Sequence, residues 1–458
     1  MRIKLSIPLS IKRICAYTSA INKGYGEEDI IEYITTDTRE IEKGDLFIAL
    51  IGDKYDANDF CSDAELLGAY IISSSYSGCC IKVKDTLAAL RDLAKAYKKH
   101  LSSLKHTVAI TGSVGKTTTK NFTAAILSGA FKTHSTKGNE NNLIGAPLTI
   151  LSAPADTEVL VIELGMNHLG EIERLSEAVA PDIAVITNIG SSHIGNLGSR
   201  KMIARAKCEI LAGMDKGCAI VPKDEVLLSE IKCKRTVSAN DADADYYYFL
   251  VSESAKESVI DFYFKDKCIQ NLKIPLFGAH IIYSLALAIS VAAECGLSIE
   301  DIQKGCKNID EHSVRHKLLQ LNDFFIFDDS YNSSLESVEA DLAMLKTLKG
   351  HKTSALLGDI HELGAETERI HRRLGEIAYE SGIEHLYIYG IYSSFVAKGA
   401  LKRGMNPDKI FINTDLFKPE LTAKQIKSAH TPGEIILFKA SHKTNLSKII
   451  DLLREDAN

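Results

Sequence analysis

The residues best suited to chemistry form a short glycine-rich loop, GSVGKTTTK, at 112–120. Its glycines let successive backbone N–H groups turn inward around a phosphate, and a helix starting at the loop adds partial positive charge. Lys116 supplies a point charge toward the outer phosphates, and the Thr117 hydroxyl suits Mg²⁺. The predicted nucleotide cradle consists of Gly112, Ser113, Val114, Gly115, Lys116, Thr117 and Thr118.

The sequence of this loop by itself identifies a phosphate site with only moderate specificity. The full eight-residue phosphate-loop pattern needs glycine where this chain has Ile110. The alternative is an ordinary glycine-rich turn, but an apolar strand pattern precedes the loop and a helix pattern follows it. This context favours a phosphate site.

Two further groups could hold a metal ion beside that phosphate. Glu163 closes the apolar run VLVIE, and His193 follows the run IAVITNI by a few residues. The carboxyl ends of parallel strands converge on one crevice, and Mg²⁺ needs several oxygen ligands. We therefore predict that Thr117, Glu163 and His193 meet around a metal, although a lone histidine is often only a hydrogen-bonded structural residue.

Elements that can position these residues follow from the alternation of apolar runs and helix patterns. Strands are predicted at 107–111, 158–164 and 183–189, with helices at 116–127, 171–179 and 200–211. The alternating run at 259–264 predicts an antiparallel edge strand. A second series of five strands, each followed by a helix, begins near 324, whereas the first hundred residues show little such alternation.

The fold class is therefore α/β with three domains, in keeping with 458 residues at roughly 150 per domain. We expect a small α/β N-terminal domain at 1–103 and a central, mostly parallel, P-loop-type domain at 104–312. A C-terminal Rossmann-like α/β domain is expected at 313–458.

The composition limits the classes of partner that are expected. The net charge is −6, from 54 basic and 60 acidic residues with mixed signs, so neither nucleic acid nor a polybasic membrane contact is expected. The ten cysteines show no metal-ligand spacing and are interpreted as reduced thiols, most of them in the core.

Two segments bear on membranes and targeting. The apolar start of the chain is interrupted by Lys12 and Arg13, which argues against a signal peptide. The run 274–293 has no Asp, Glu, Lys or Arg, but Pro275 and Gly278 occupy its first part and the remaining apolar run is too short to span a bilayer. We expect a buried helix there, no membrane insertion, and a cytoplasmic monomer.

Seven motifs along the chain together resemble those of one enzyme family. GSVGKTTTK, GNENN (138–142), ELGMNHLGEI (163–172), ITNIGSSHIGNLGS, ARAKCEIL, DDSYN (328–332) and LLGDIHELG (356–364) resemble those of the Mur ligases. The similarity spans all three predicted domains. It is greatest to the members that add D-alanyl-D-alanine to UDP-N-acetylmuramoyl-tripeptide in peptidoglycan precursor synthesis, and those two substrates are the partners that it implies.

The resemblance implies a chemistry and its cofactors. Mur ligases use ATP to phosphorylate a carboxylate, and an amine then attacks the acyl phosphate to give an amide. The negative charge that develops is stabilised by Mg²⁺ and Lys116. Lys207 would correspond to the family's carbamylated lysine, an anion that serves a second Mg²⁺; without the resemblance it would be a solvated helix residue.

The remaining site residues are also carried over from the resemblance. Asn139 and Asn142 match residues near the acceptor end of the nucleotide sugar, and Thr38 and Arg39 match a motif that contacts UDP. In the third domain, Arg315 and Asp329 correspond to residues that reach ATP when the domains close, and Tyr331 and Asn332 belong to the same loop. Without the resemblance, Asp329 would be a solvated carboxylate at a strand end.

Several positions depart from the family pattern. Ile281 and Ser284 stand where asparagines usually contribute to adenine recognition, and Ser334-Leu335 replaces an Asn-Pro pair. Asp56-Ala57-Asn58 and Lys439-Ala440-Ser441-His442 also differ from the usual D-G-H and K-G-S-R. Two alternatives therefore stay open: a related Mur-type ligase with a different carboxylate and amine, and a nucleotide-binding relative with little turnover.

Overall fold

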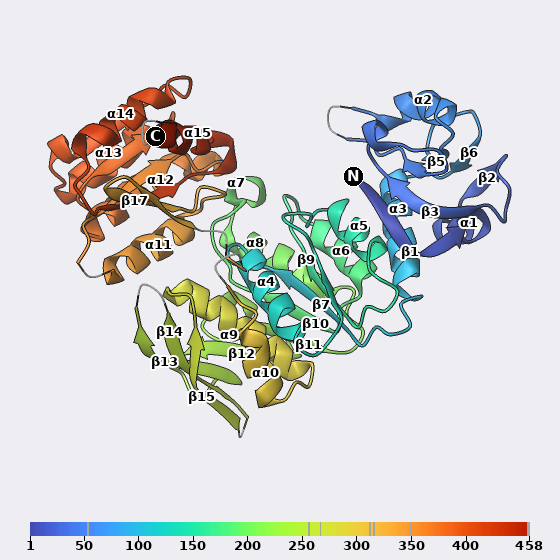
Figure 1. Ribbon diagram of the computed structural model, residues 1–458, viewed down its shortest axis with the longest axis horizontal. Helices are drawn as coiled ribbons and strands as arrows, with labels where there is room; N and C mark the ends of the chain where they lie inside the picture. The colour runs from blue at the N-terminus through green and yellow to red at the C-terminus, as the bar shows by residue number, and fades with distance from the viewer. Residues whose placement is uncertain are drawn as a thin grey trace.

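The computed structural model describes residues 1–52, 55–254, 257–265, 267–310, 313–314, 317–348 and 350–455. Three sheets follow one another along the chain, and Figure 1 shows them as three lobes coloured blue, cyan to yellow, and orange to red. We call these lobes the first, central and third units. The α/β fold class is confirmed.

The first unit is built on a six-stranded mixed sheet in the order β1-β3-β4-β5-β6-β2. The strands are β1 (Arg2–Ser10), β2 (Ile21–Lys23), β3 (Ile30–Thr35), β4 (Leu46–Ile48), β5 (Tyr70–Ser73) and β6 (Cys80–Lys82). The helices are α1 (Ile11–Thr18), α2 (Cys61–Leu66) and α3 (Thr86–Lys98), with a 3-10 turn at Thr38–Glu40. Three of these strands have only three residues, which is too short to give a sequence pattern.

The central unit holds a nine-stranded sheet in the order β15-β14-β13-β12-β11-β10-β7-β9-β8. The strands are β7 (His106–Thr111), β8 (Thr133–Ser135), β9 (Val159–Glu163), β10 (Ile183–Ile186), β11 (Cys218–Pro222), β12 (Lys234–Ala239), β13 (Tyr246–Glu253), β14 (Ser258–Phe264) and β15 (Lys267–Ile274). The helices are α4 (Lys116–Leu127), α5 (Gly145–Leu151), α6 (Glu171–Val179), α7 (Ile194–Leu197), α8 (Arg200–Cys208), α9 (Ala279–Glu294) and α10 (Ile299–Cys306). The strands up to β13 pair in parallel, so β7, β9 and β10 end side by side.

One expectation about this sheet is wrong. The run at 259–264 is antiparallel, as expected, but it lies in β14, which is paired on both sides. The edge is β15, whose burial alternates irregularly because one face is open to solvent.

The uncharged run near 274–293 contributes α9, a helix with eleven buried residues. It packs beside α4 and against the central sheet, which explains why it is apolar on nearly every side. In the described part of the chain, no helix combines the length and apolar character needed to cross a bilayer.

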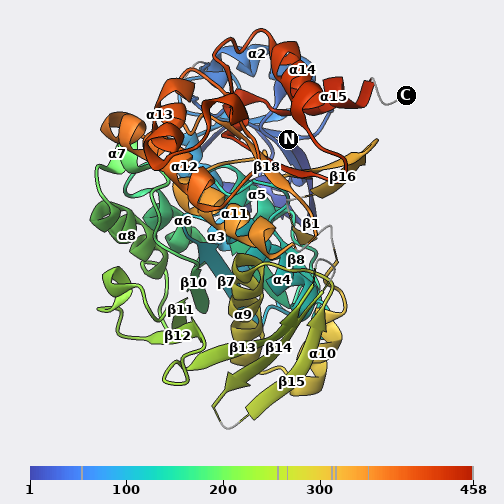
Figure 2. The same cartoon turned by 90° about the vertical axis from the view of Figure 1, so that its left-hand side faces the viewer.

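The third unit has a six-stranded sheet in the order β16-β17-β21-β18-β19-β20. The strands are β16 (Lys317–Leu321), β17 (Phe324–Asp328), β18 (Thr353–Gly358), β19 (Leu386–Tyr389), β20 (Ile410–Asn413) and β21 (Ile435–Lys439). The helices are α11 (Leu335–Thr347), α12 (Thr367–Glu380), α13 (Ser393–Arg403), α14 (Pro419–Ala429) and α15 (Ser447–Glu455). The five predicted strand–helix pairs are present, and antiparallel β16 precedes them. Figures 1 and 2 both show α7 of the central unit against this third unit.

Candidate active site

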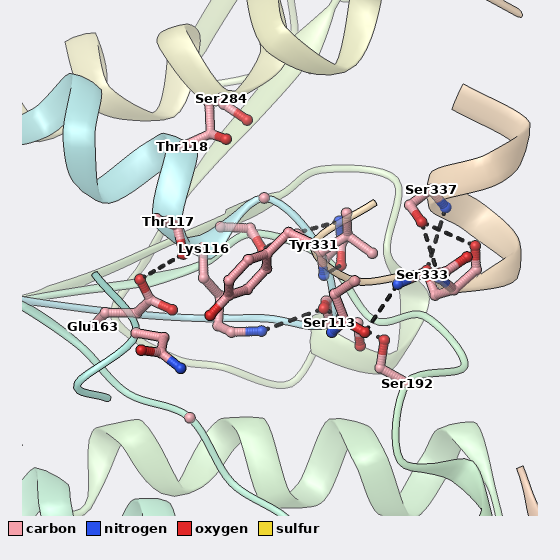
Figure 3. Close-up of a pocket in the computed structure, with 18 of the residues that line it drawn as sticks. Ser113, Lys116, Thr117, Thr118, Glu163, Ser192, Ser284, Tyr331, Ser333 and Ser337 are labelled. Atoms are coloured by element: carbon pink, nitrogen blue, oxygen red, sulfur yellow. Dashed lines mark hydrogen bonds between the residues drawn. The ribbon is translucent and has the colours of Figure 1, made fainter. Parts of the chain in front are cut away.

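A cavity of about 440 Å³ lies between the central and third units. Its lining joins the loop before α4, the first turn of α9, the loop after β17 and the first turns of α11. Figure 3 shows side chains from these sources: Ser113, Lys116, Thr117 and Thr118 from the glycine-rich loop and the start of α4, Ser284 from α9, and Tyr331, Ser333 and Ser337 from the third unit. Residues far apart in sequence thus share one site.

The glycine-rich loop has the conformation that an anion cradle needs. Gly112 and Gly115 have φ values of 150° and 82°, and a Cβ on Gly112 would lie 1.9 Å from the Thr187 hydroxyl oxygen. Asn188 braces the loop, because its side-chain and main-chain oxygens accept the N–H groups of Val114 and Ser113 at 2.9 and 3.2 Å. The next donors belong to the first turn of α4, where helix N–H groups have no intrahelical partner.

Lys116 folds back over this loop. Its ammonium group donates to the carbonyl oxygens of Gly112 and Ser113 at 2.8 and 3.3 Å. The lysine charge is therefore held beside the phosphate cradle before any ligand enters.

Glu163 provides the buried carboxylate of the site. It ends β9 next to β7, is 1% exposed, and accepts the Thr117 hydroxyl at 2.8 Å and the Asn141 amide at 2.7 Å. A hydroxyl and a carboxylate facing a phosphate cradle form an oxygen donor set that fits Mg²⁺, which takes few protein ligands and completes its shell with phosphates and water. Among the described residues no cluster of three or more His, Cys, Asp and Glu side chains could hold a metal by itself.

Lys207 lies on α8 with its side chain 1% exposed. The interpretation as a solvated helix residue is wrong. Burial, together with the nearby charge of Lys116, holds the pKa of this amine well below its usual range. The negative charge of Glu163 acts in the opposite direction and raises the Lys207 pKa. Lys207 is not part of the cavity lining.

His193 lines the same cavity as Thr117 and Glu163. It stands just before α7 with φ 63°, and its Nδ1 lies 2.7 Å from a carboxylate oxygen of Glu362 in the third unit. The contact with the His193 ring holds the pKa of the Glu362 carboxyl below its usual range, although the Nδ1–H is not aligned with the carboxylate as a hydrogen bond requires.

The third unit contributes Asp329, Tyr331 and Asn332 to the cavity lining. Asp329 is not simply solvated, because its carboxylate contacts the ammonium group of buried Lys439. Arg315 lies outside the described residues.

The other predicted residues divide into two groups. Asn139 and Asn142 line the cavity, and the Asn142 side chain also accepts the N–H groups of Ile144 and Gly145 at the start of α5. Thr38 and Arg39 are not in this lining; they lie in the first unit, where the Arg39 guanidinium pairs with Asp37 at 2.6 Å.

Sequence reasoning missed several residues of the site. Asn188 and Asn141 were not assigned roles, although each lies in a motif that the resemblance rests on. Glu362 and Lys439 were missed because their partners come from other elements, His193 after β10 and Asp329 after β17. No sequence spacing reports such contacts.

Comparisons with known proteins agree with this geometry. Residues 110–292 match the Mur ligase middle domain family. The chain is 36% identical to the UDP-N-acetylmuramoyl-tripeptide–D-alanyl-D-alanine ligase of Bacillus subtilis, with 94% of each chain covered. The ligase of the same name from Escherichia coli is 31% identical, with 94% of this chain and 95% of the relative covered.

Solved structures show the same likeness over the whole chain. MurF from Acinetobacter baumannii superposes with a TM-score of 0.89 at 28% identity, covering 99% of this chain and all of that one. A MurF ligase from Thermotoga maritima in complex with ADP has the same fold, with a TM-score of 0.79 at 24% identity over 93% of this chain and 97% of that one.

Proposed function

This chain belongs to the Mur ligase family, and from that premise we propose that it adds D-alanyl-D-alanine to UDP-N-acetylmuramoyl-tripeptide with consumption of ATP. It is an ATP-dependent, ADP-forming amide ligase of peptidoglycan precursor synthesis. The observation that carries this function is the cavity in which a phosphate loop, the buried Glu163 carboxylate and the Asp329 loop of the third unit meet.

The reaction proceeds in two steps on the substrate carboxylate. A carboxylate oxygen takes the γ-phosphoryl group of ATP, which gives an acyl phosphate and ADP. The amine of the dipeptide then attacks the acyl carbon, and the amide forms as phosphate leaves and the amine loses a proton. Lys116 and the first N–H groups of α4 stabilise the charge on the transferring phosphoryl group by their fixed positions.

Magnesium would be held by the Thr117 hydroxyl, the Glu163 carboxylate and His193. When bound, it neutralises the phosphate oxygens and lowers the barrier for phosphoryl transfer. The buried hydrogen bond between Thr117 and Glu163 supports this assignment, since it already orients two oxygen donors toward the phosphate loop.

A carbamate on Lys207 would provide ligands for a second Mg²⁺. The neutral amine attacks CO₂, a C–N bond forms, one proton is released, and a cation becomes an anion. Only the neutral amine is nucleophilic, and the low pKa of Lys207 favours that form.

The three units would divide the substrates among them. Residues 1–103, with Thr38 and Arg39, would hold the UDP end, and 104–312 would bind ATP, with Asn139 and Asn142 near the acceptor end. Residues 313–458 would bring Arg315, Asp329, Tyr331 and Asn332 to ATP and the dipeptide as the units close. We place the enzyme in the cytoplasm as a monomer.

A related ligase with another amine is the second candidate. The observation that favours it is that Ser334 lines the cavity where the family has asparagine, while Ser441 and His442 line a smaller neighbouring cavity. Such changes alter the surface offered to the incoming amine. The phosphate-binding residues are unaffected.

The test is phosphate release from ATP with UDP-N-acetylmuramoyl-tripeptide present, measured with and without D-Ala-D-Ala. We expect release that depends on both substrates and is lost in Lys116→Ala, with Lys448→Ala, which replaces an exposed lysine, as the matched control. Release that is independent of the dipeptide, or none, would contradict the proposal. Release only with a different amine would identify the second candidate.

A further inference from the structure

The loop that follows β10 is held to the third unit by two glutamates. The Ser191 N–H and hydroxyl donate to the Glu336 carboxylate at 2.8 and 3.0 Å. Two residues along, His193 Nδ1 lies 2.7 Å from Glu362, and the Gly195 N–H donates to the Glu362 carbonyl oxygen at 2.9 Å. Both the side chain and the backbone of Glu362 therefore engage this loop.

The backbone at the second contact is strained on both sides. His193 and Glu362 each have φ 63°, a left-handed conformation that is unfavourable for a non-glycine residue and persists only where its surroundings enforce it. The two backbone segments also approach closely, since a Cβ on Gly195 would lie 2.5 Å from the Glu362 carbonyl oxygen. The packing of the third unit against this loop therefore enforces the left-handed backbone conformation of both residues.

The Glu362 contact differs in kind from the Glu336 contact. The Glu336 carboxylate accepts hydrogen bonds from the backbone and hydroxyl of Ser191, whereas the Glu362 carboxylate contacts one of the two ring nitrogens of His193. The negative charge of a carboxylate 2.7 Å from Nδ1 favours the tautomer in which Nδ1 carries hydrogen and Nε2 keeps its lone pair, although the Nδ1–H is not aligned with the carboxylate as a hydrogen bond requires. Histidine ligands of metals commonly have such a carboxylate on the other nitrogen.

We propose that Glu362 is a positioning residue that fixes the orientation and tautomer of His193, so that metal binding by the central unit is coupled to docking of the third unit. The inference rests on the proposed role of His193 as a magnesium ligand. His193 lines both the main cavity and the smaller cavity that residues of the third unit share. Because coupling is reciprocal, bound metal must favour the docked arrangement by the same factor.

The alternative is that Glu362 only joins the two units. The pair is partly exposed, 23% at His193 and 41% at Glu362, so as an ion pair alone it adds little to stability. Glu336→Gln is the matched control, because it weakens the same interface two residues away and leaves the His193 ring in place.

The experiment measures Mn²⁺ affinity by electron paramagnetic resonance in the full chain, with a non-hydrolysable ATP analogue present. Glu362→Gln is expected to weaken Mn²⁺ binding roughly 10- to 100-fold, the usual cost of losing such an outer partner, while Glu336→Gln changes it by less than about 3-fold. In the same samples, small-angle scattering should report compaction by Mn²⁺ in wild type and less of it in Glu362→Gln. The Mg²⁺ concentration for half-maximal turnover should rise, with kcat at saturating Mg²⁺ largely kept.

Two results would overturn the inference: wild-type Mn²⁺ affinity in Glu362→Gln, or equal weakening in both glutamate variants, which would mean that the interface alone matters. The variant His193→Ala distinguishes failure of this inference from failure of the proposed function. If only His193→Ala weakens binding, the metal site stands and the coupling does not. If neither His193→Ala nor Glu362→Gln weakens it, the assignment of His193 is wrong, and the inference fails with it.

Discussion

The Asp341 carboxylate lies 2.8 Å from the ammonium nitrogen of Lys439, and both residues are almost completely buried, at 2% and 1% exposure. Lys439 ends β21 and also contacts Asp329, while Asp341 comes from α11. On the other side, His280 of α9 lies 3.6 Å from Asp341. One lysine thus holds two carboxylates at the edge of the cavity, and it fixes the predicted nucleotide-binding Asp329 in place.

We expect Lys439→Met to destabilise the third unit strongly. Removal of one partner from a buried ion pair leaves uncompensated charge and costs about 3–5 kcal/mol. Hydrogen exchange in β21 and α11 along a urea series is the suitable measurement, because a chain with three units need not unfold in one step. Lys448→Met, at an exposed position on α15, is the control and should change little. Equal protection in the two variants would rule out a stabilising role for the Lys439 cluster.

Asp341→Asn should reveal the pH dependence of the same cluster. Burial raises the pKa of the Asp341 carboxyl, with Asp329 adding to the shift and Lys439 opposing it. Above the unfolded pKa of about 4, the folded state retains a proton that the unfolded chain releases, so wild-type stability falls as pH rises toward the raised value.

In Asp341→Asn this position does not titrate, so the variant does not lose stability in this way as the pH rises. Its melting temperature relative to wild type should therefore increase between about pH 5 and about pH 7.5 and level off above the raised pKa. A difference that stays constant over this range would show that Asp341 does not titrate there. Asp408→Asn, at an exposed aspartate of the same unit, serves as the control.

Lys207→Ala should lose activity about 100-fold or more, because the variant lacks the buried amine on which the proposed carbamate would form. Added acetate or bicarbonate should restore part of the activity by occupying the space of the carbamate. Phosphate release at fixed substrate concentrations is the measurement, and Lys201→Ala, at an exposed position on the same helix, is the matched control. Full activity in Lys207→Ala would remove the carbamate from the mechanism.

Thiol labelling should follow burial. Cys233 and Cys268 are exposed, whereas burial raises the pKa of Cys295 and Cys306 to about 12. The thiolate is the reactive form, so iodoacetamide at about pH 8 should modify the two exposed residues first. Peptide mass spectrometry checks this, with denatured protein as the reference for complete labelling. Rapid modification of Cys306 in the native chain would contradict the packing around α10.

The cysteines also show the limits of composition as a guide. All ten are free, but only four are buried, four are intermediate and two are exposed, so the prediction that most lie in the core is wrong. Nothing in the spacing of a cysteine along the chain reports which face of an element it occupies once that element joins a sheet.

The sequence by itself determined the local part of this protein: the phosphate loop between β7 and α4, the carboxylate at the end of β9, and the five strand–helix pairs of the third unit. These features depend on backbone freedom, apolar periodicity and strand ends, all of which act over a few residues. Only the tertiary structure decided that Lys207 is buried, that His193 contacts Glu362, and that Lys439 holds Asp329 and Asp341. Those contacts join segments more than 90 residues apart, and they exist because packing of whole sheets and units, not local preference, brings the charges together.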